Sequence, residues 1–530
     1  MTIHKVLIAG SWRDSDATGT FQAEDPRLKK TLPDEYPVSQ WEDCDEALDA
    51  AVDAFEQLRQ MPAERIAEFL EAYADRIEAR SQEICELASQ ETALPVQPRL
   101  ASGELPRTTG QLRQAAAAAR SSNWCHPTID TKANIRSCFA AIGPVAVFGP
   151  NNFPLAFGSI SGGDFAAAIA AGNPVIAKGH PLHPGTTRLL AEEALEAVKQ
   201  TGLPQSTVQL IYHMDYADGE RLVRDSRLAA VSYTGSRTAG LKLKAAADSV
   251  GKPIYLEMSS VNPVVVLPGA LEERLEEIAT GLSNSCLMGT GQFCTNPGLV
   301  IVVEDEKARA FQRSLADKFA AAPVGTLLSS DGQGGLSSAI DALKQAGAET
   351  ICGASAGGGA GYSYANTVLQ ASGEQFLANP QALQGEAFGN ATLVVTASSI
   401  AQVVEMIKQL EGNLTGCVYS ATDGGDDAAY DQLAPHLRQR VGRLLNDQVP
   451  TGVAVCPAMN HGGPFPATGH PGFTAVGIPA SLIRFAMLQC YDNVRPHRLP
   501  PVLQDENRGD VWRLIDGQWT QADVGALASA

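Results

Sequence analysis

The sequence predicts an α/β fold in which open, largely parallel sheets are covered by helices. Short runs rich in β-branched residues alternate with helix-length segments between about 140 and 270. A second α/β unit starts at Asn262-Pro263-Val264-Val265-Val266 and extends to about Val455. Before both units, the first 130 residues carry apolar side chains at helical spacing. These three observations predict two sheet-containing units preceded by a helical segment.

The elements of the first unit follow from its apolar runs. Helices are expected at 47–59 and 65–87, ahead of the sheet. Ligands of such open sheets bind at the carboxyl ends of the strands. The expected strands are 144–148, 174–177, 208–212, 229–233 and 254–256, and the helices between them are 159–171, 187–201, 219–224 and 238–250.

In the second unit, the apolar runs at 264–266, 301–303 and 392–395 predict strands, and helices are expected at 271–287 and 307–319. The Gly- and Ala-rich tract 353–361 lacks the Lys-Ser/Thr ending of a phosphate-binding loop. It is predicted to be a mobile surface loop.

Composition narrows the function classes. The chain has 530 residues, 44% hydrophobic and 19% charged, which is enough for two or more domains with sizeable cores. Its net charge of −19 disfavours nucleic acid or an anionic membrane as a general partner. The ten cysteines form no CxxC pair and no metal-like spacing with histidine, so no metal is expected. Without a signal-like N-terminus or an apolar run of about 18 residues, a cytoplasmic protein is predicted.

Three polar residues beside apolar runs suggest nucleophilic catalysis. Cys294 stands among small and polar residues just before the run 299–303. Glu257 ends the predicted strand 254–256, and Asn152 follows the run 144–148. A thiol needs a base to become a nucleophile, and a carboxamide can donate to an oxyanion. The set supplies a nucleophile, a base and an oxyanion donor.

A dinucleotide site is indicated only weakly by local pattern. The chain has no GxGxxG, but Gly235 and Ser236 lie between a predicted strand and a helix. Backbone N–H groups at a helix start bind phosphate. An ordinary strand-to-helix turn has the same residues, so both interpretations stay open at this point.

Taken together, six motifs resemble the aldehyde dehydrogenase superfamily, in its order and over nearly the full length of the chain. The resemblance implies a thiohemiacetal and then a thioester on Cys294, an oxyanion contact from Asn152 and water activation by Glu257. The motifs are Gly149-Pro150-Asn151-Asn152-Phe153-Pro154-Leu155, Pro174-Val175-Ile176-Ala177-Lys178, Tyr233-Thr234-Gly235-Ser236, Leu256-Glu257-Met258, Gly291-Gln292-Phe293-Cys294 and Glu386-Ala387-Phe388-Gly389.

The resemblance also implies a division of the chain into two open α/β domains and a small β arm. The cofactor-binding domain would comprise 1–124 and 142–262, and the catalytic domain 263–455. An oligomerisation arm and tunnel wall would comprise 125–141 and 456–500, with a C-terminal tail at 501–530. The family's arm strands pair between subunits, so a homodimer or homotetramer is expected.

The implied cofactor is a nicotinamide dinucleotide. NAD-preferring relatives often carry a glutamate three residues after the lysine, but here that position is Pro181. Without a like charge there, the 2′-phosphate of NADP can pair with Lys178. NADP is therefore predicted, with NAD possible. The implied cofactor residues are Lys178, Ser236, Gly235, Glu386, Phe388 and Pro150.

Within the superfamily, the stretches 151–157, 180–186, 257–263 and 292–298 look like the α-ketoglutaric semialdehyde (2,5-dioxopentanoate) dehydrogenases. A nearby branch holds NADP-dependent fatty-aldehyde dehydrogenases, and an aromatic aldehyde is a further alternative. A substrate carboxylate needs a cation or several donors. The predicted substrate contacts are Arg107 and Gln111 on one helix face, and the predicted tunnel walls are Phe153, His461 and Phe465.

Two alternatives of other kinds stay open. The chain could be a non-redox thioester hydrolase or a structural member of the family, because fold does not fix function. A CoA-acylating enzyme is also conceivable, but that reaction dispenses with the water that Glu257 would activate. Cys294, Glu257, Asn152 and Lys178 together favour oxidation followed by hydrolysis.

Overall fold

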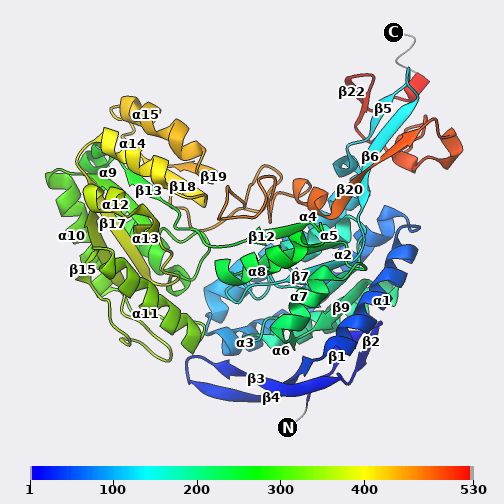
Figure 1. Cartoon of the computed structure of the whole chain (residues 1–530), viewed down its shortest axis with the longest axis horizontal. Coiled ribbons are helices and arrows are strands. Elements are labelled where there is room, and N and C mark those ends of the chain that lie inside the picture. The colour runs from blue at the N-terminus through cyan, green and yellow to red at the C-terminus, as the bar shows by residue number, and fades with distance from the viewer. Residues whose placement is uncertain (1–2, 526–530) are drawn as a thin grey trace.

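Residues 3–525 are described by a computed structural model, which forms two lobes and a projecting arm (Figure 1). The first lobe is built on a seven-stranded sheet of order β12-β11-β7-β8-β9-β1-β2, parallel from β12 to β9. Its central strands are almost wholly buried and rich in Val, Ile and Ala, as sheets covered on both faces require. The strands are β1 (Val6–Ile8), β2 (Ser11–Arg13), β7 (Val145–Phe148), β8 (Val175–Lys178), β9 (Val208–Ile211), β11 (Ala230–Thr234) and β12 (Ile254–Glu257).

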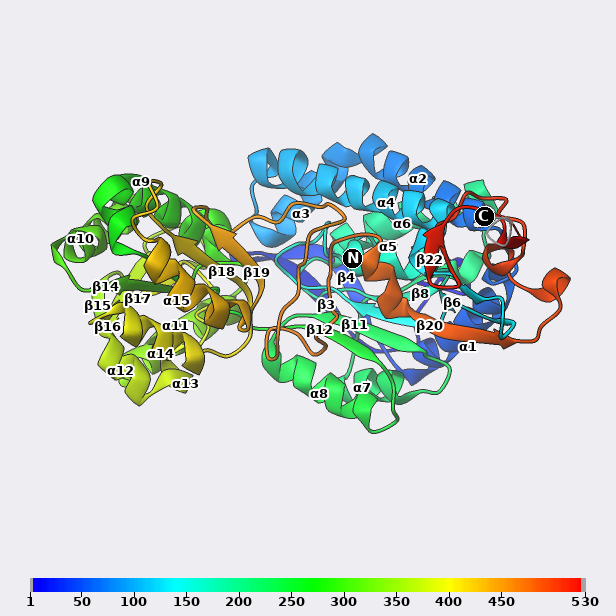
Figure 2. The same cartoon turned by 90° about the horizontal axis from the view of Figure 1, so that it is seen from above.

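Helices cover both faces of this sheet, and a small sheet of order β10-β4-β3 flanks it (Figure 2). One helix, α5, has every residue buried. The helices are α1 (Trp41–Leu58), α2 (Ala63–Ala79), α3 (Ser81–Thr92), α4 (Leu105–Ser121), α5 (Gly163–Ala170), α6 (Pro184–Thr201), α7 (Tyr216–Arg224) and α8 (Arg237–Asp248), and the flanking strands are β3 (Ala17–Asp25), β4 (Lys30–Ser39) and β10 (His213–Met214).

The second lobe has its own seven-stranded sheet, of order β15-β16-β17-β14-β13-β18-β19. Only the edge pair β15–β16 is antiparallel. Its strands are β13 (Val264–Val266), β14 (Leu299–Val303), β15 (Glu349–Cys352), β16 (Thr367–Ser372), β17 (Ala391–Ala397), β18 (Asn413–Tyr419) and β19 (Val441–Asn446). Its helices are α9 (Pro268–Leu287), α10 (Glu306–Ala321), α11 (Ser330–Gln345), α12 (Gly373–Ala378), α13 (Pro380–Leu383), α14 (Ile400–Gln409) and α15 (Asp427–Arg438).

The strand order of the first sheet fixes where a ligand can bind. From β7 the chain moves outward to β8 and β9, and it then returns to add β11 and β12 on the other side of β7. Open α/β sheets bind ligands in the crevice at such a reversal, outside the carboxyl ends of the strands. Glu257, at the end of β12, lies at this edge, and the loops after β7 and β11, which carry Asn152 and Gly235 with Ser236, begin there.

The arm is a five-stranded sheet of order β20-β6-β5-β21-β22 that projects from the first lobe (Figure 1). Its strands are β5 (Thr128–Asp130), β6 (Ile135–Ala141), β20 (Ala486–Asp492), β21 (Arg513–Ile515) and β22 (Gln518–Thr520). The predicted tail at 501–530 is therefore not separate over its described part, because β21 and β22 belong to the arm sheet. Residues 526–530 of that tail lie outside the described residues.

The predicted elements recur with shifted ends, and three features differ. The expected helix 65–87 is two helices, α2 and α3, that meet at Arg80. The hairpin β3–β4 was not predicted, because its strands show no clear alternation of apolar and polar residues. The Gly- and Ala-rich tract is held in place: Tyr362, just after it, donates its N–H to Pro26 O at 3.1 Å and its hydroxyl to Glu24 Oε1 at 2.8 Å. The tract thus ties the second lobe to the β3 region.

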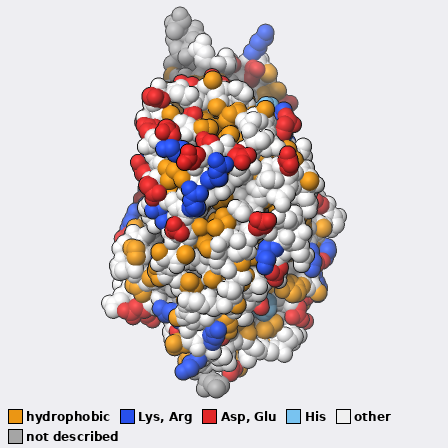
Figure 3. Space-filling model, turned by 90° about the vertical axis from the view of Figure 1, so that its left-hand side faces the viewer, with side chains coloured by type: hydrophobic (Ala, Val, Ile, Leu, Met, Phe, Trp, Pro, Cys, Tyr) orange, Lys and Arg blue, Asp and Glu red, His pale blue; other side chains and the backbone are white. Residues whose placement is uncertain are grey.

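Within residues 3–525, no helix combines the length and apolar character needed to cross a membrane. On the face that Figure 3 shows, acidic and basic side chains are scattered rather than gathered by sign. This distribution offers no basic patch of the kind that binds nucleic acid on that face.

Candidate functional site

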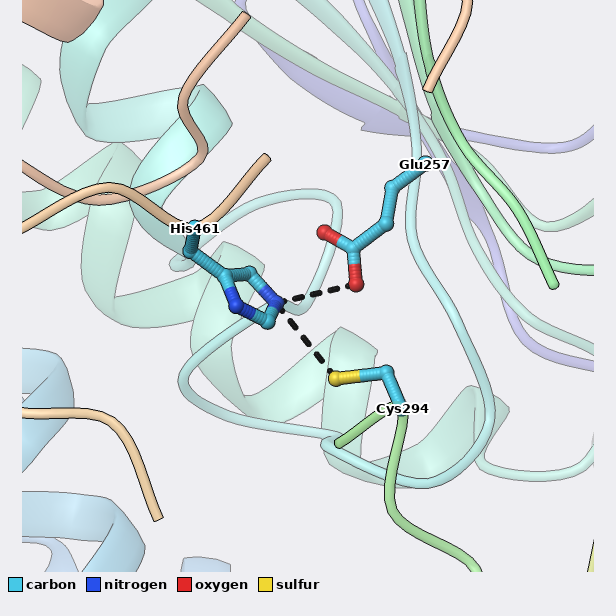
Figure 4. Close-up of side chains that lie close together, drawn as sticks. All are labelled: Glu257, Cys294 and His461. Atoms are coloured by element: carbon cyan, nitrogen blue, oxygen red, sulfur yellow. Dashed lines mark hydrogen bonds and ion pairs between the residues drawn. The ribbon is translucent and has the colours of Figure 1, made fainter. Parts of the chain in front are cut away.

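Three reactive side chains from distant parts of the chain meet between the lobes (Figure 4). His461 Nε2 lies 2.9 Å from Glu257 Oε1 and 3.4 Å from Cys294 Sγ. Glu257 and His461 are each 1% exposed, and Cys294 is half-buried. A single ring nitrogen thus faces both a thiol and a carboxylate.

The turn that presents Cys294 requires an unusual backbone. Gly291 has φ +69°, and a Cβ there would lie 2.0 Å from Gly389 O. Only glycine fits such a close approach at positive φ. On the other side, Asn262 donates from Nδ2 to the carbonyl oxygens of Cys294 and Asn296, each at 2.9 Å. The turn of Cys294 is therefore held by close backbone packing on one side and by the Asn262 side chain on the other.

Asn152 lies beside this turn, as the sequence predicted. It is 7% exposed and donates from Nδ2 to Gln292 O at 2.9 Å, two residues before Cys294. Its loop is anchored by the buried Glu104, whose Oε1 accepts from Leu155 N at 2.8 Å and Ala156 N at 2.9 Å. No local pattern indicates this anchor, because Glu104 is about 50 residues away from the loop in the sequence.

The thiol needs a base in this environment. Burial raises the pKa of Cys294 well above its usual value, and the neighbouring Glu257 raises it further, whereas Arg107 lowers it. At neutral pH the resting residue is a thiol, and the thiolate forms only when the proton is removed. The ring nitrogen of His461 is the hydrogen-bonding partner of Sγ and can accept that proton.

A cavity of about 740 Å³ opens beside Cys294 and is lined by Phe293 and Phe153 together with Arg99, Arg107 and Gln114. Phe153 packs edge-on against Phe293, with ring centroids 5.0 Å apart. The walls are largely apolar, and they carry two guanidinium groups, of which Arg99 is paired with the carboxylate of Glu104 and Arg107 is not. This combination suits a small organic substrate that carries an anionic group.

The two arginines of the cavity differ in their partners. Arg99 pairs with Glu104, donates to Asn152 O at 3.0 Å and stacks 4.2 Å over the Phe153 ring. Arg107, on α4, has buried Nε and Nη2 atoms without a hydrogen-bond partner among the described residues. Burial lowers the pKa of this guanidinium. Arg99 Nε also lacks a partner, but Arg107 has more unpartnered donors and no carboxylate paired with it among the described residues. Arg99 was not among the predicted residues.

Three of the predicted substrate residues lie elsewhere. Gln111 donates from Nε2 to Ala156 O at 3.0 Å and does not line the cavity, because it lies one helical turn after Arg107 and packs on the loop 153–157. Phe465 is 58% exposed and lies beneath Arg237, outside the lining of this cavity. His461 is not merely a tunnel wall, since it connects Cys294 and Glu257.

A second cavity, of about 370 Å³, lies between the lobes and is lined by Ser259, Ser260, Arg237 and Glu386 among others. Burial raises the pKa of Glu386 to about 7, and its Oε1 accepts from Ser260 N at 3.3 Å. A buried carboxylate that faces a cavity can accept hydrogen bonds from ribose hydroxyls, so this donor and acceptor set fits a nucleotide sugar.

The remaining predicted cofactor residues lie around the reversal of the first sheet. Lys178 ends β8, and burial lowers its pKa to about 8. Ser236 caps α8, with Oγ accepting from Ala239 N at 3.3 Å. A Cβ at Gly235 would lie 2.6 Å from the hydroxyl of Tyr233. Pro150 O lies 3.0 Å from His183 Nε2, and Phe388 is half-buried.

Histidines surround Lys178. The pKa of His180 is well below its usual value, because of burial first and then the proximity of His183, Lys178 and His213. These rings are neutral at pH 7, and they leave the lysine as the charged group at the end of β8. The position of the family's glutamate is Pro181, as the sequence indicated.

Comparison with known proteins identifies relatives along most of the chain. Residues 12–435 match the aldehyde dehydrogenase family. The chain is 38% identical to alpha-ketoglutaric semialdehyde dehydrogenase 2 of Azospirillum brasilense, over 97% of this chain and 98% of that protein. It is 36% identical to alpha-ketoglutaric semialdehyde dehydrogenase of Acinetobacter baylyi, over 91% of this chain and 92% of that protein.

Solved structures match the fold. A putative aldehyde dehydrogenase from Burkholderia cenocepacia superposes with a TM-score of 0.79 at 22% identity, covering 93% of this chain and 99% of that one. Lactaldehyde dehydrogenase from Escherichia coli gives a TM-score of 0.78 at 22% identity, covering 92% and 98%. Fold, family match and the relatives of high coverage agree, and the chain belongs to the aldehyde dehydrogenase family.

Proposed function

We propose that this protein oxidises 2,5-dioxopentanoate (α-ketoglutaric semialdehyde) to 2-oxoglutarate, with NADP preferred and NAD accepted. The observation that carries the substrate is Arg107, which lines the cavity beside Cys294 and whose guanidinium has two buried donor atoms without a hydrogen-bond partner among the described residues. Two relatives that match over more than nine-tenths of this chain are named for the same aldehyde. A five-carbon oxo-acid offers an aldehyde to the thiol and a carboxylate to the guanidinium.

The catalytic steps follow from the triad. His461 Nε2 takes the proton of the Cys294 thiol, and the sulfur attacks the aldehyde carbon. Since the same nitrogen lies 2.9 Å from Glu257, the proton can pass on to the carboxylate. The oxyanion of the thiohemiacetal would be stabilised by Asn152 Nδ2 and the backbone N–H of Cys294. Asn152 would exchange its bond to Gln292 O for one to the oxyanion.

Hydrolysis completes the reaction. A bound nicotinamide supplies the hydride acceptor that converts the thiohemiacetal to a thioester. Glu257, after returning its proton to solvent, removes a proton from a water molecule that attacks the thioester. The acid then leaves and Cys294 is regenerated. The buried position of Glu257 next to the sulfur supports this second role.

The cofactor preference rests on the surroundings of Lys178. Neutral histidines, rather than a carboxylate, neighbour this lysine. A 2′-phosphate would therefore meet one positive charge and no repulsion. Glu386 would hold the nicotinamide ribose, and Ser236 at the start of α8 would face the pyrophosphate. Pro150, Gly235 and Phe388 complete the proposed cofactor contacts.

We also propose roles for the lobes and the arm. The first lobe would bind the cofactor, the second would supply Cys294, and the arm would join subunits into a dimer or tetramer. The free edge of β20 supports the last point, since Met487 is 47% and Leu488 59% exposed there. Exposed strand edges are commonly covered by a partner strand.

Product analysis tests the proposed reaction. Purified protein given 2,5-dioxopentanoate and NADP without CoA is expected to form one 2-oxoglutarate for each NADPH. An absolute requirement for CoA would contradict the hydrolytic step. Release of acid from a preformed thioester without any nicotinamide reduction would instead favour the non-redox alternative.

A further inference from the structure

We propose that Cys294, His461 and Glu257 form an inhibitory zinc site. The possible ligand atoms, a cysteine sulfur, a histidine nitrogen and a carboxylate oxygen, all lie within 4.8 Å of one another. Of the described residues, these three alone form such a group of potential metal ligands. Their positions in the sequence, 37 and 167 residues apart, gave no metal-binding pattern.

The chemistry of the set selects zinc. Sulfur, imidazole nitrogen and carboxylate oxygen are all zinc ligands, and catalytic zinc sites use three protein ligands with a fourth position open to water. Magnesium and calcium prefer all-oxygen sites, so they are expected to bind much more weakly here. Zinc is therefore expected to bind this ligand set more tightly than magnesium or calcium does.

Two of the three distances between the ligand atoms are close to those that a tetrahedral ion needs, and all three are below 4.8 Å. With metal–ligand bonds of about 2.0–2.3 Å, ligand atoms stand roughly 3.3–3.7 Å apart. His461 Nε2 and Cys294 Sγ are 3.4 Å apart already. Nε2 and Glu257 Oε1, at 2.9 Å, need to separate by a few tenths of an ångström. A small rotation of the Glu257 side chain provides this movement.

An independent feature of the site also points to a cation. Glu257 Oε2 is buried and has no hydrogen-bond partner among the described residues. A carboxylate with an unsatisfied buried oxygen is stabilised by a positive ion. Phe293, next to Cys294 in the sequence, lines the larger cavity, and Ser259, two residues after Glu257, lines the smaller one.

Zinc binding and catalysis would exclude each other. The sulfur forms a bond to zinc and releases its proton to solvent, one proton for each ion bound, without any change of oxidation state. The lone pair that would attack the aldehyde is then engaged, and His461 can no longer accept the thiol proton. Zinc should inhibit reversibly, and a chelator should restore activity.

Direct binding tests the site without relying on turnover. Equilibrium dialysis of the whole protein against zinc is expected to show one tight site per subunit that Cys294→Ser and His461→Gln each weaken at least about tenfold. Cobalt is expected to give a sulfur-to-metal charge-transfer absorption that is absent in Cys294→Ser. Cys490→Ser, which removes an exposed cysteine of the arm, is the matched control and should bind like the unaltered protein.

The outcomes separate this proposal from the proposed function. Equal zinc binding by the unaltered protein and both triad variants, all with unchanged circular dichroism, would overturn the inference and indicate adventitious sites only. Loss of binding in Cys490→Ser alone would overturn it as well. Glu257→Gln provides a second test, because it keeps the shape of the side chain and should still lower affinity. Failure to oxidise 2,5-dioxopentanoate would leave these binding results unaffected.

Discussion

Replacing Arg107 by methionine should remove the oxo-acid preference while preserving the reaction. The substitution keeps an unbranched apolar stem and removes two buried donors that lack partners. A hydrogen bond to a charged group contributes about 1.5–3 kcal/mol, and a paired contact to one carboxylate about 2–4 kcal/mol in total. At 1.36 kcal/mol for each factor of ten, kcat/KM for 2,5-dioxopentanoate should fall about 30- to 900-fold.

The assay compares two aldehydes by initial rates of nicotinamide reduction. Hexanal has no carboxylate, so its kcat/KM should change less than about threefold in Arg107→Met. Arg113→Met is the matched control, because Arg113 lies on the same helix but is exposed and paired with Asp75 and Glu78. An equal loss on both aldehydes would refute the assignment of Arg107 to the carboxylate, and a loss in Arg113→Met would show that α4 itself had been disturbed.

Three further substitutions test the rest of the site. His461→Asn should lower kcat about 10²- to 10⁴-fold and slow the alkylation of Cys294 by iodoacetamide. The pH profiles of both rates should shift to higher pH. An unchanged alkylation rate would exclude a role of His461 as the base. Glu257→Gln should accumulate one acyl group per subunit, measured by intact-protein mass; free enzyme throughout would contradict its role in hydrolysis. Because the pKa of Lys178 is about 8, its ammonium is present below that pH and lost above it. KM for NADP should therefore rise between pH 7 and 9 while KM for NAD stays nearly constant, and Lys178→Met should remove this difference; parallel profiles in the unaltered protein would argue against a 2′-phosphate contact.

The residues that could be predicted from the sequence lie next to recognisable strands. Glu257 ends β12, Lys178 ends β8, and Cys294 precedes β14, so each apolar run located its neighbouring candidate residue. Parallel sheets bring such ends together at one edge, which is why the cleft could be anticipated. The backbone just before Cys294 adopts a positive φ at Gly291, a conformation that glycine in the sequence allows.

The missed features depend on contacts that local pattern does not encode. His461 belongs to the long irregular segment between β19 and β20, where no periodicity indicates what a side chain faces. Glu104 and Arg99 act on the loop of Asn152, about 50 positions away. Gln111 shares the predicted helix face with Arg107, but the loop 153–157 covers it one turn further along. Tertiary packing decided each of these cases.

The most direct test of the account is the ratio of kcat/KM for 2,5-dioxopentanoate to that for hexanal, measured with NADP and with NAD. A guanidinium that pairs with the substrate carboxylate predicts a ratio of at least about 30 with either cofactor, and a higher kcat/KM with NADP than with NAD. A ratio near or below one would contradict the central claim and assign the cavity to an apolar aldehyde.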